Sequence, residues 1–338
     1  MQRPPSANAA SGPGVGSRWK GAPVAGPAIP AVAPEAQRGD CLLTTSDDRR
    51  PGSANMPHSL DMVFNLYGDY IRHRTGEGWT GSLIELLGLL GLSSQAVRST
   101  LSRLSRKGWL QSRKAGRYSF YSLTPKCVQL LEEGEQRIFH PRSDPWDGRW
   151  HLLIYSIPES KRHLRRRLRT RLRWLGFGML NHAIWISPRD ARQEVRQLAD
   201  AFGLRPYVEL FVAQSPTFAR DEEIVTRCWE LQGLNAYYAG FIDRNQPVLR
   251  HYRDLLAAED TVQPQACFVQ RSKLIDDYRS SPYVDPNLPP ELLPEDWLGE
   301  RASQLFQQLN ELMSKPAGAF VDAVLAKAPP IRPIGRET

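Results

Sequence analysis

The residues best suited to specific chemistry lie in the stretch 91–123, where hydrogen-bonding and basic side chains surround one predicted helix. Val97, Leu101 and Leu104 form an apolar stripe along residues 94–107, which predicts an amphipathic helix. The polar side chains on its other faces are Ser94, Gln95, Arg98, Ser99, Ser102, Arg103 and Arg106. Arginine pairs with guanine and glutamine with adenine through two parallel hydrogen bonds, and serine hydroxyls bond phosphates. This helix is therefore predicted to contact both the bases and the backbone of DNA.

A short basic hairpin follows the helix. Residues 109–112 and 118–123 have the pattern of two strands, joined by a turn that contains Lys114, Ala115, Gly116 and Arg117. The residues expected to contact phosphates, the minor groove or the sugar backbone are Arg113, Lys114, Arg117 and Tyr118. Helix and hairpin together predict a winged helix-turn-helix, whose third helix enters the major groove. The alternative is a solvated helix face beside a surface hairpin, as in protein-interaction domains.

Neighbouring helices are expected to position this stretch. Leu60, Val63, Phe64, Tyr67 and Ile71 recur at spacings of three and four, which predicts a first amphipathic helix. A turn at 75–78 and a nearly all-apolar helix at 81–90 follow, and a further helix is expected over 125–139. The serine at position 93 is well placed to cap the helix at 94–107. The DNA-binding domain is expected to span residues 58–140.

Composition favours a polyanionic partner and argues against a membrane protein. The chain has 338 residues, a net charge of +8 and a pI near 9.4. Its longest apolar run, residues 83–92, contains Glu85 and is far shorter than the roughly 20 residues that cross a bilayer. The first residues lack the apolar core of a signal peptide, so a cytoplasmic location is expected. The four cysteines are widely separated, which predicts reduced thiols and no metal site.

Residues 1–57 are rich in Pro, Ala, Gly, Ser and Arg and show no helical or strand period. Such a segment buries too little apolar surface to offset the entropy of ordering, so it is predicted to be disordered. Met56 stands directly before the first periodic segment. A start codon assigned too far upstream is therefore a plausible explanation of the tail.

The order of predicted elements after residue 145 indicates two further domains. Residues 146–215 alternate strand, helix, strand, helix and strand, with strands expected at 150–157, 179–187 and 207–213. This is the order of a small ferredoxin-like α+β domain. Residues 216–328 are expected to form an all-helical domain, with helices at 221–231, 247–258, 263–280 and 300–313, and a short one at 320–325. Four prolines make 286–297 an extended connector.

The predicted helix at 160–175 is strongly basic around a stripe of leucines. Three interpretations remain open for it. In these interpretations its arginines bind the phosphates of an anionic ligand, add non-specific DNA affinity, or form a solvated face. The candidate ligand residues on this helix are Arg162, Arg165, Arg166 and Arg169.

The sequence resembles the phenylacetic-acid degradation repressor family, PaaX. The resemblance runs in order from about Ser59 to Leu325. The segments that carry it are 66–70 (LYGDY), 96–98 (AVR), 103–104 (RL), 108–110 (GWL), 116–117 (GR), 121–124 (YSLT), 146–150 (WDGRW), 175–178 (LGFG) and 285–299 (DPNLPPELLPEDWLG). The resemblance implies a GntR-like winged helix, a middle domain similar to Cas2 and a helical carboxy-terminal domain.

The resemblance also implies a function. It implies a dimeric transcriptional repressor of aromatic catabolism, released from operator DNA by phenylacetyl-coenzyme A. The expected partners are double-stranded operator DNA, an acyl-coenzyme A effector and a second copy of the chain, with no cofactor. Two alternatives remain: a regulator of another catabolic operon with a different acyl-coenzyme A effector, and a nucleic-acid-processing protein of the Cas2 kind.

An enzymatic function is not expected. Proteins of the Cas2 kind can be metal-dependent nucleases that hold Mg²⁺ with an Asp at the end of the first strand, where this chain has Ser156. A hydroxyl is a far poorer ligand for that ion than a carboxylate, and the nearby Glu159 has no visible partner. Motifs of serine hydrolases, phosphate-binding loops, dinucleotide folds and zinc proteases are absent from the sequence. No catalytic or metal-binding residue is therefore predicted.

Overall fold

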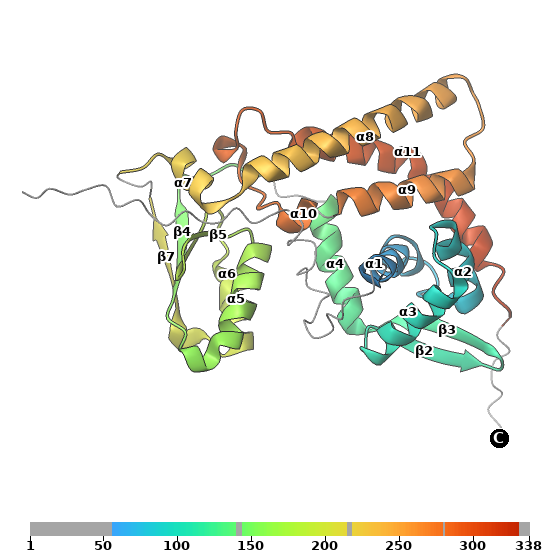
Figure 1. Cartoon of the computed structure of the whole chain (residues 1–338), viewed down its shortest axis with the longest axis horizontal. Coiled ribbons are helices and arrows are strands. Elements are labelled where there is room, and N and C mark those ends of the chain that lie inside the picture. The colour runs from blue at the N-terminus through green and yellow to red at the C-terminus, as the bar shows by residue number, and fades with distance from the viewer. Residues whose placement is uncertain (1–55, 140–143, 215–217, 280, 331–338) are drawn as a thin grey trace, which may run out of the picture. The chain divides into compact units, whose positions relative to one another are not determined.

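The computed structural model describes residues 56–139, 144–214, 218–279 and 281–330, so most of the predicted tail lies outside the described residues. The described chain is a mixture of helices and two small antiparallel sheets (Figure 1). Its first part contains α1 (Met56–Leu66), a π-helical segment η2 (Tyr67–Ile71), β1 (Glu77–Trp79), α2 (Thr80–Leu89), α3 (Ser94–Arg106), β2 (Leu110–Ala115), β3 (Tyr118–Leu123) and α4 (Pro125–Phe139).

The helix α3 forms where the sequence predicts it. Its first turn is capped because the hydroxyl of Ser93 accepts a hydrogen bond from the backbone N–H of Ala96 at 3.2 Å. Val97, Leu101 and Leu104 are at most 1% exposed and pack in one core with α1 and α2. The predicted cap and apolar stripe are therefore confirmed.

A three-stranded sheet in the order β1-β3-β2 follows α3. Ala115 pairs with Tyr118, so only Gly116 and Arg117 form the turn, and Gly116 has a φ of +58° that favours glycine. Lys114 thus belongs to β2 and not to the turn predicted for it. The predicted turn at 75–78 is also shorter, because Glu77–Trp79 pairs with β3 as strand β1.

The middle part has the elements β4 (Trp150–Tyr155), α5 (Arg162–Trp174), β5 (Gly178–Asn181), β6 (Ile184–Ser187), α6 (Arg192–Phe202) and β7 (Val208–Ala213). Their sheet order is β5-β6-β4-β7, all antiparallel, which is the ferredoxin-like arrangement expected. The single strand predicted at 179–187 is a hairpin instead. Its turn forms because the side-chain oxygen of Asn181 accepts hydrogen bonds from the N–H groups of Ala183 and Ile184 at 2.9 and 3.0 Å.

The last part is helical. It contains α7 (Asp221–Cys228), α8 (Leu231–Ala257), α9 (Pro264–Tyr278), α10 (Ser281–Val284), a single 3₁₀ turn η5 (Pro290–Leu292) and α11 (Gly299–Leu325). Two of the predicted helix boundaries are wrong. The helix expected from residue 247 begins at Leu231 and runs through Pro247, and α11 continues through Pro316 where two helices were expected. Packing of these long helices compensates for the hydrogen bond that each proline removes.

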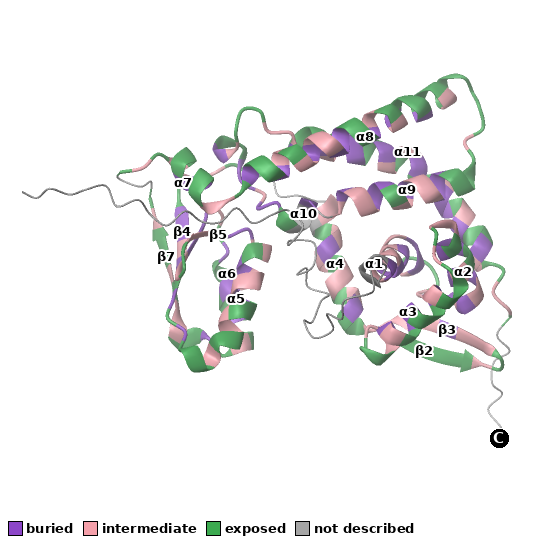
Figure 2. Ribbon diagram, viewed as in Figure 1, coloured by how far each residue is buried: buried purple, intermediate pink, exposed green. Residues whose placement is uncertain are grey.

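Three hydrophobic cores hold these elements. One core includes side chains of α1–α3 together with α8, α9 and α11, so the first and last parts of the chain share it. A second lies between the middle sheet and α5–α6, and a third covers the other face of that sheet with α7 and the 286–293 connector. Figure 2 shows buried residues along α11, whereas β2 is mostly exposed. No helix in the described ranges is long and apolar enough to cross a membrane.

Candidate nucleic-acid interface

The polar side chains of α3 lie on its outer surface. The exposed residues of the predicted set are Ser94, Gln95, Arg98, Ser99, Ser102 and Arg106. Arg103 differs from them because it is half-buried beside the core. The structure therefore presents Gln95 and Arg98 near the start of α3, the end of a recognition helix that reaches base edges in helix-turn-helix proteins.

The hairpin adds two exposed cations at its tip. Lys114 and Arg117 are both exposed, and they flank the turn at Gly116. The guanidinium of Arg117 donates to the Tyr118 hydroxyl at 2.8 Å and lies 5.1 Å from the centre of its ring. Tyr118 in turn makes an edge contact with Trp79. These contacts limit the rotamers of Arg117 while leaving its charge accessible.

Arg113 is placed differently from the other predicted contacts. Its Nε donates to a carboxylate oxygen of Glu77 at 3.0 Å, and the guanidinium lies 4.8 Å from the centre of the Phe120 ring. The hydrogen bond with Glu77 raises the pKa of Arg113 above its ordinary value. Arg113 therefore lies over the Phe120 ring, and its charge is paired with that of Glu77. This pairing depends on strand β1, which was not predicted from the sequence.

The surface around α3 and the hairpin is cationic because its sequence contains no acidic residue. Residues 86–131 include eight Lys or Arg and neither Asp nor Glu. Exposed polar residues of this region that were missing from the predicted set include Lys107, Gln111, Ser112 and Lys126. Lys107 and Lys126 flank the hairpin, and the acid-free run of sequence is the signal that would have included them. Lys126 lies 4.4 Å from the centre of the Trp109 ring.

Side-chain hydrogen bonds attach the hairpin to the helices behind it. The Tyr67 hydroxyl donates to the carbonyl of Tyr121 at 2.8 Å, and Thr80 donates to the carbonyl of Ser119 at 2.8 Å. Burial raises the pKa of Tyr67 well above its ordinary value, so the phenol stays a donor. The hairpin is thus fixed to η2 and α2 by bonds from buried residues.

Known proteins resemble the chain over most of its length. The family profile described as PaaX-like protein matches residues 58–127, PaaX protein central Cas2-like domain matches 143–225, and PaaX-like protein C-terminal domain matches 229–323. The transcriptional repressor PaaX of Escherichia coli (strain K12) is 36% identical over 263 residues, or 77% of this chain and 82% of the repressor. The chain belongs to the PaaX family.

A solved structure shares the fold of this PaaX-family chain. An uncharacterized protein from Mycobacterium tuberculosis aligns with a TM-score of 0.50 and 22% sequence identity, covering 78% of this chain and 99% of that protein. At this identity the likeness concerns the fold alone. The resemblance inferred from the ordered motifs is confirmed by the three matched profiles and by the identity to the repressor.

The four arginines proposed as ligand contacts on α5 of the Cas2-like domain divide into two pairs. Arg165 forms an ion pair with Glu159 at 2.7 Å, and Arg169 donates to the Tyr155 hydroxyl at 2.7 Å and to the carbonyl of His182 at 2.9 Å. Arg162 and Arg166 are exposed. The internal partners of Arg165 and Arg169 make them parts of the domain's own structure, and α5 does not present all four as one anion site.

The end of β4, where a nuclease of the Cas2 kind needs a metal-binding acid, has no such group in this PaaX-family chain. Ser156 is exposed and its N–H donates to the carbonyl of Tyr207 at 2.9 Å, while Glu159 is paired with Arg165. Within the described ranges, no group of three or more His, Cys, Asp or Glu residues is arranged to hold a metal ion.

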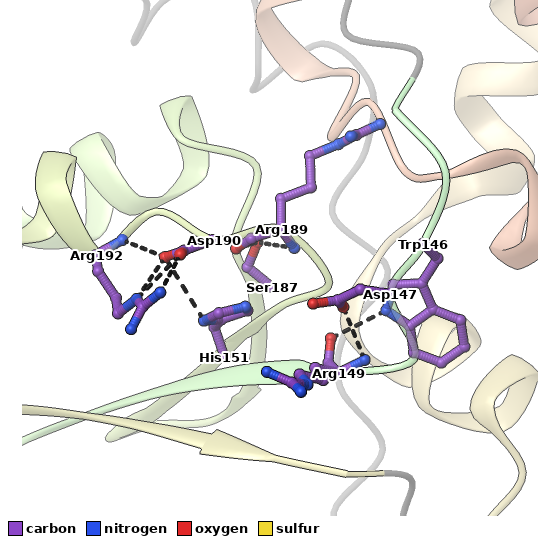
Figure 3. Close-up of polar contacts among 8 residues, drawn as sticks. All are labelled: Trp146, Asp147, Arg149, His151, Ser187, Arg189, Asp190 and Arg192. Carbon is purple, nitrogen blue, oxygen red and sulfur yellow. Dashed lines mark hydrogen bonds and ion pairs between the residues drawn. The ribbon is translucent and has the colours of Figure 1, made fainter.

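A polar cluster instead occupies the opposite end of β4 (Figure 3). Nδ1 of the buried His151 lies 4.0 Å from an Asp190 carboxylate oxygen, and Arg192 binds the same carboxylate at 2.6 Å. Arg192 lowers the pKa of Asp190 to about 2, while burial lowers the pKa of His151 below 6.5. The sequence did not single out this cluster, because His151 and Asp190 are brought together only by the sheet.

Proposed function

We propose that this PaaX-family protein is a transcriptional repressor that binds operator DNA through α3 and the β2–β3 hairpin as a winged helix-turn-helix. The single observation that carries the proposal is the set of exposed basic residues on α3 and the β2–β3 hairpin, within a run of sequence, residues 86–131, that contains no Asp or Glu. The name of the Escherichia coli relative, transcriptional repressor PaaX, supports the same function. An extended positive surface is what attraction to the phosphate backbone requires.

The exposed groups suit three kinds of DNA contact. Gln95 and Arg98 have the length and donor geometry for base edges in the major groove, and the serines of α3 suit phosphates. Lys114 and Arg117 at the hairpin tip suit the phosphates or the minor groove beside the site. Tyr118 is proposed to pack on the sugar backbone, while the paired Arg113 contributes less than its sequence position implies.

We further propose that the regulated genes are those of phenylacetate or a related aromatic catabolism, with an aryl-acyl-coenzyme A such as phenylacetyl-coenzyme A as the effector. Family membership supports this pathway. Binding as a homodimer to a two-fold operator would place two copies of α3 in successive major grooves. Titration of the DNA complex with a panel of acyl thioesters distinguishes this effector from that of another catabolic operon.

Fluorescence anisotropy with a labelled duplex from the region upstream of the chain's own gene tests the DNA contacts. Arg98→Ala is expected to weaken binding by about 1–3 kcal/mol and to reduce the preference over a scrambled duplex. Arg117→Ala is expected to weaken both duplexes and to reduce the slope of log affinity against log salt by about 1. The matched control is Arg301→Ala, which removes an exposed arginine of α11.

Unchanged affinity and unchanged salt dependence in both variants would contradict this docking. Equal loss in the Arg301→Ala control would show a general effect of net charge, and would remove the support for α3 and the hairpin as the binding surface.

A further inference from the structure

The helix α5 of the Cas2-like domain carries more positive charge than its surroundings neutralise. Residues 161–173 include eight Lys or Arg and neither Asp nor Glu. Two of these cations form ion pairs, Arg165 with Glu159 at 2.7 Å and Arg171 with Glu133 at 3.6 Å. Among the residues that the structure describes, no carboxylate lies within ion-pair distance of the other six. Most of the positive charge of α5 therefore remains available to a partner outside the protein.

Three of the arginines without a carboxylate partner form a row on the outer side of the helix. Leu168 and Leu172 are at most 1% exposed and pack in the core between α5, α6 and the sheet. Because an α-helix has 3.6 residues per turn, Arg162, Arg166 and Arg173 lie within about 40° of one another, turned away from these leucines. All three are exposed. We call this row the arginine stripe, and it spans about 16 Å of the helix axis.

Contacts within the protein give no reason for this concentration of charge. The side chains of Arg162 and Arg166 make no hydrogen bond, ion pair or ring contact with any described residue. They are four residues apart on one helix, a spacing at which like charges destabilise the helix. Arg162 also lies in the first turn of α5, where the helix dipole disfavours a cation and no acidic residue compensates it. The stripe therefore weakens the helix that carries it unless an anion lies against it.

We propose that the arginine stripe of α5 binds the phosphate backbone of duplex DNA, outside the base pairs contacted by α3, as a second and sequence-independent contact. The inference rests on the proposed DNA-binding function. A DNA strand carries a regular series of negative charges, which suits a row of exposed guanidinium groups. Because α3 and α5 belong to one chain, DNA held by α3 raises the local concentration of phosphates near the stripe. Even a weak contact there adds to the total affinity.

The form of the stripe favours a long polyanion over a small anionic ligand. Arg162 and Arg173 are separated by three turns of helix, so a single phosphate group cannot contact both of them. The cavities beside α9 have no lining residue from α5, so the stripe does not form the entrance of either one. A row of exposed charges on the outside of a helix instead matches an extended surface such as the DNA backbone.

Fluorescence anisotropy of the full chain on the labelled upstream duplex and on a scrambled duplex tests the stripe. The glutamine variant Arg162→Gln, Arg166→Gln, Arg173→Gln removes three charges but keeps good helix formers. Its affinity for both duplexes is expected to fall, and its salt slope to be shallower by about 3 per bound protomer. Between about 50 and 200 mM salt the wild type should therefore lose about 40-fold more affinity than the variant does. The ratio of the two affinities should not change, because phosphates carry no sequence information.

Two matched variants separate a DNA contact from an effect of net charge. The control Arg227→Gln, Arg250→Gln, Arg301→Gln removes three exposed arginines of α7, α8 and α11 and should keep the wild-type salt slope. Lysine at the three positions of the stripe keeps the charge and should restore most of the affinity, because an ammonium group also binds phosphate. Hydroxyl-radical footprinting should show backbone positions that lose protection in the glutamine variant and lie outside those that change in Arg98→Ala.

The outcomes distinguish failure of the stripe from failure of the proposed function. Wild-type affinity and salt slope in the glutamine variant, or equal losses in the control variant, would overturn the stripe as a DNA contact and keep the role of α3. Unchanged DNA binding with lost calorimetric binding of coenzyme A would assign the stripe to a small anionic ligand instead. Equal binding of both duplexes by the wild-type protein would contradict an operator-specific repressor, while a loss in the glutamine variant would still support the stripe.

Discussion

At the scale of single residues, the cationic surface depends on which arginines are already paired inside the protein. Arg117 and Arg98 are exposed, whereas Arg113 shares its charge with Glu77. A basic residue contributes to phosphate binding only by the charge that remains available, so a count of arginines in the sequence overstates the electrostatic term. If this surface binds DNA as proposed, Glu77 is therefore expected to limit its affinity.

Removing this acid should strengthen DNA binding. Glu77→Gln keeps the size of the side chain but frees Arg113 from an ion pair, so the affinity for the duplex is expected to rise and the salt slope to steepen by up to about 1. The ion pair is partly exposed, so its loss should change the free energy of unfolding only slightly. Fluorescence anisotropy between about 50 and 200 mM salt measures the affinity for the duplex and the salt slope. The double variant Glu77→Gln, Arg113→Ala should lose the gain, and a gain that persists there would contradict this role of Arg113.

His151 is expected to make the stability of the Cas2-like domain depend on pH. Burial lowers the pKa of His151 below 6.5, and the nearby Asp190 opposes this only in part. Well above pH 6.5 the histidine is neutral in both the folded and the unfolded state and contributes no pH dependence. As the pH falls below that value the unfolded chain binds the proton first, so the free energy of unfolding decreases until the folded protein is also protonated.

Urea unfolding near pH 7.5 and about pH 5.5 measures this effect. His151→Gln cannot be protonated and should lose less stability between the two pH values than the wild type does. The matched control is His163→Gln, which removes an exposed histidine of α5 and should retain the wild-type pH dependence. Equal losses in His151→Gln and the wild type would show that other groups cause the acid sensitivity.

At the scale of elements, the sequence predicted those segments whose local signals and tertiary contacts agree. The Ser93 cap, the Val97–Leu104 stripe and the basic helix α5 all formed as expected. The missed features depend on partners distant in sequence. Strand β1 forms because β3 pairs with it, and helices α8 and α11 continue through Pro247 and Pro316 because they pack together.

The same distinction applies to the candidate sites. The exposed residues of α3 and the hairpin were predictable because helical spacing and turn chemistry place them locally. The pairing of Arg113 with Glu77 joins β2 to β1, and the contact of His151 with Asp190 joins β4 to a residue far along the chain. No local pattern in the sequence reports such a juxtaposition.

At the scale of the whole molecule, the proposed DNA-binding surface shares a core with the carboxy-terminal helices. Leu101 of α3 and Phe306 of α11 belong to one hydrophobic core, and the Ser82 hydroxyl of α2 donates to the carbonyl of Val324 at 3.0 Å. The core of the Cas2-like domain around Leu168 is separate. A disturbance in α11 is therefore expected to reach α3 more strongly than one in α5 does.

Hydrogen exchange on two cavity-forming variants tests this coupling. Phe306→Ala removes a fully buried ring that stacks on Tyr278 at 4.2 Å, and should lower the stability of the shared core by about 3–5 kcal/mol. Protection of the α2 and α3 amides should fall with that of α9 and α11, because these four helices are expected to open as one cooperative unit. Leu168→Ala, the matched change in the other core, should reduce protection in α5 and α6 while leaving α3 unchanged. Loss of protection confined to α11 in Phe306→Ala would mean that the two ends of the chain open independently, and would contradict this coupling.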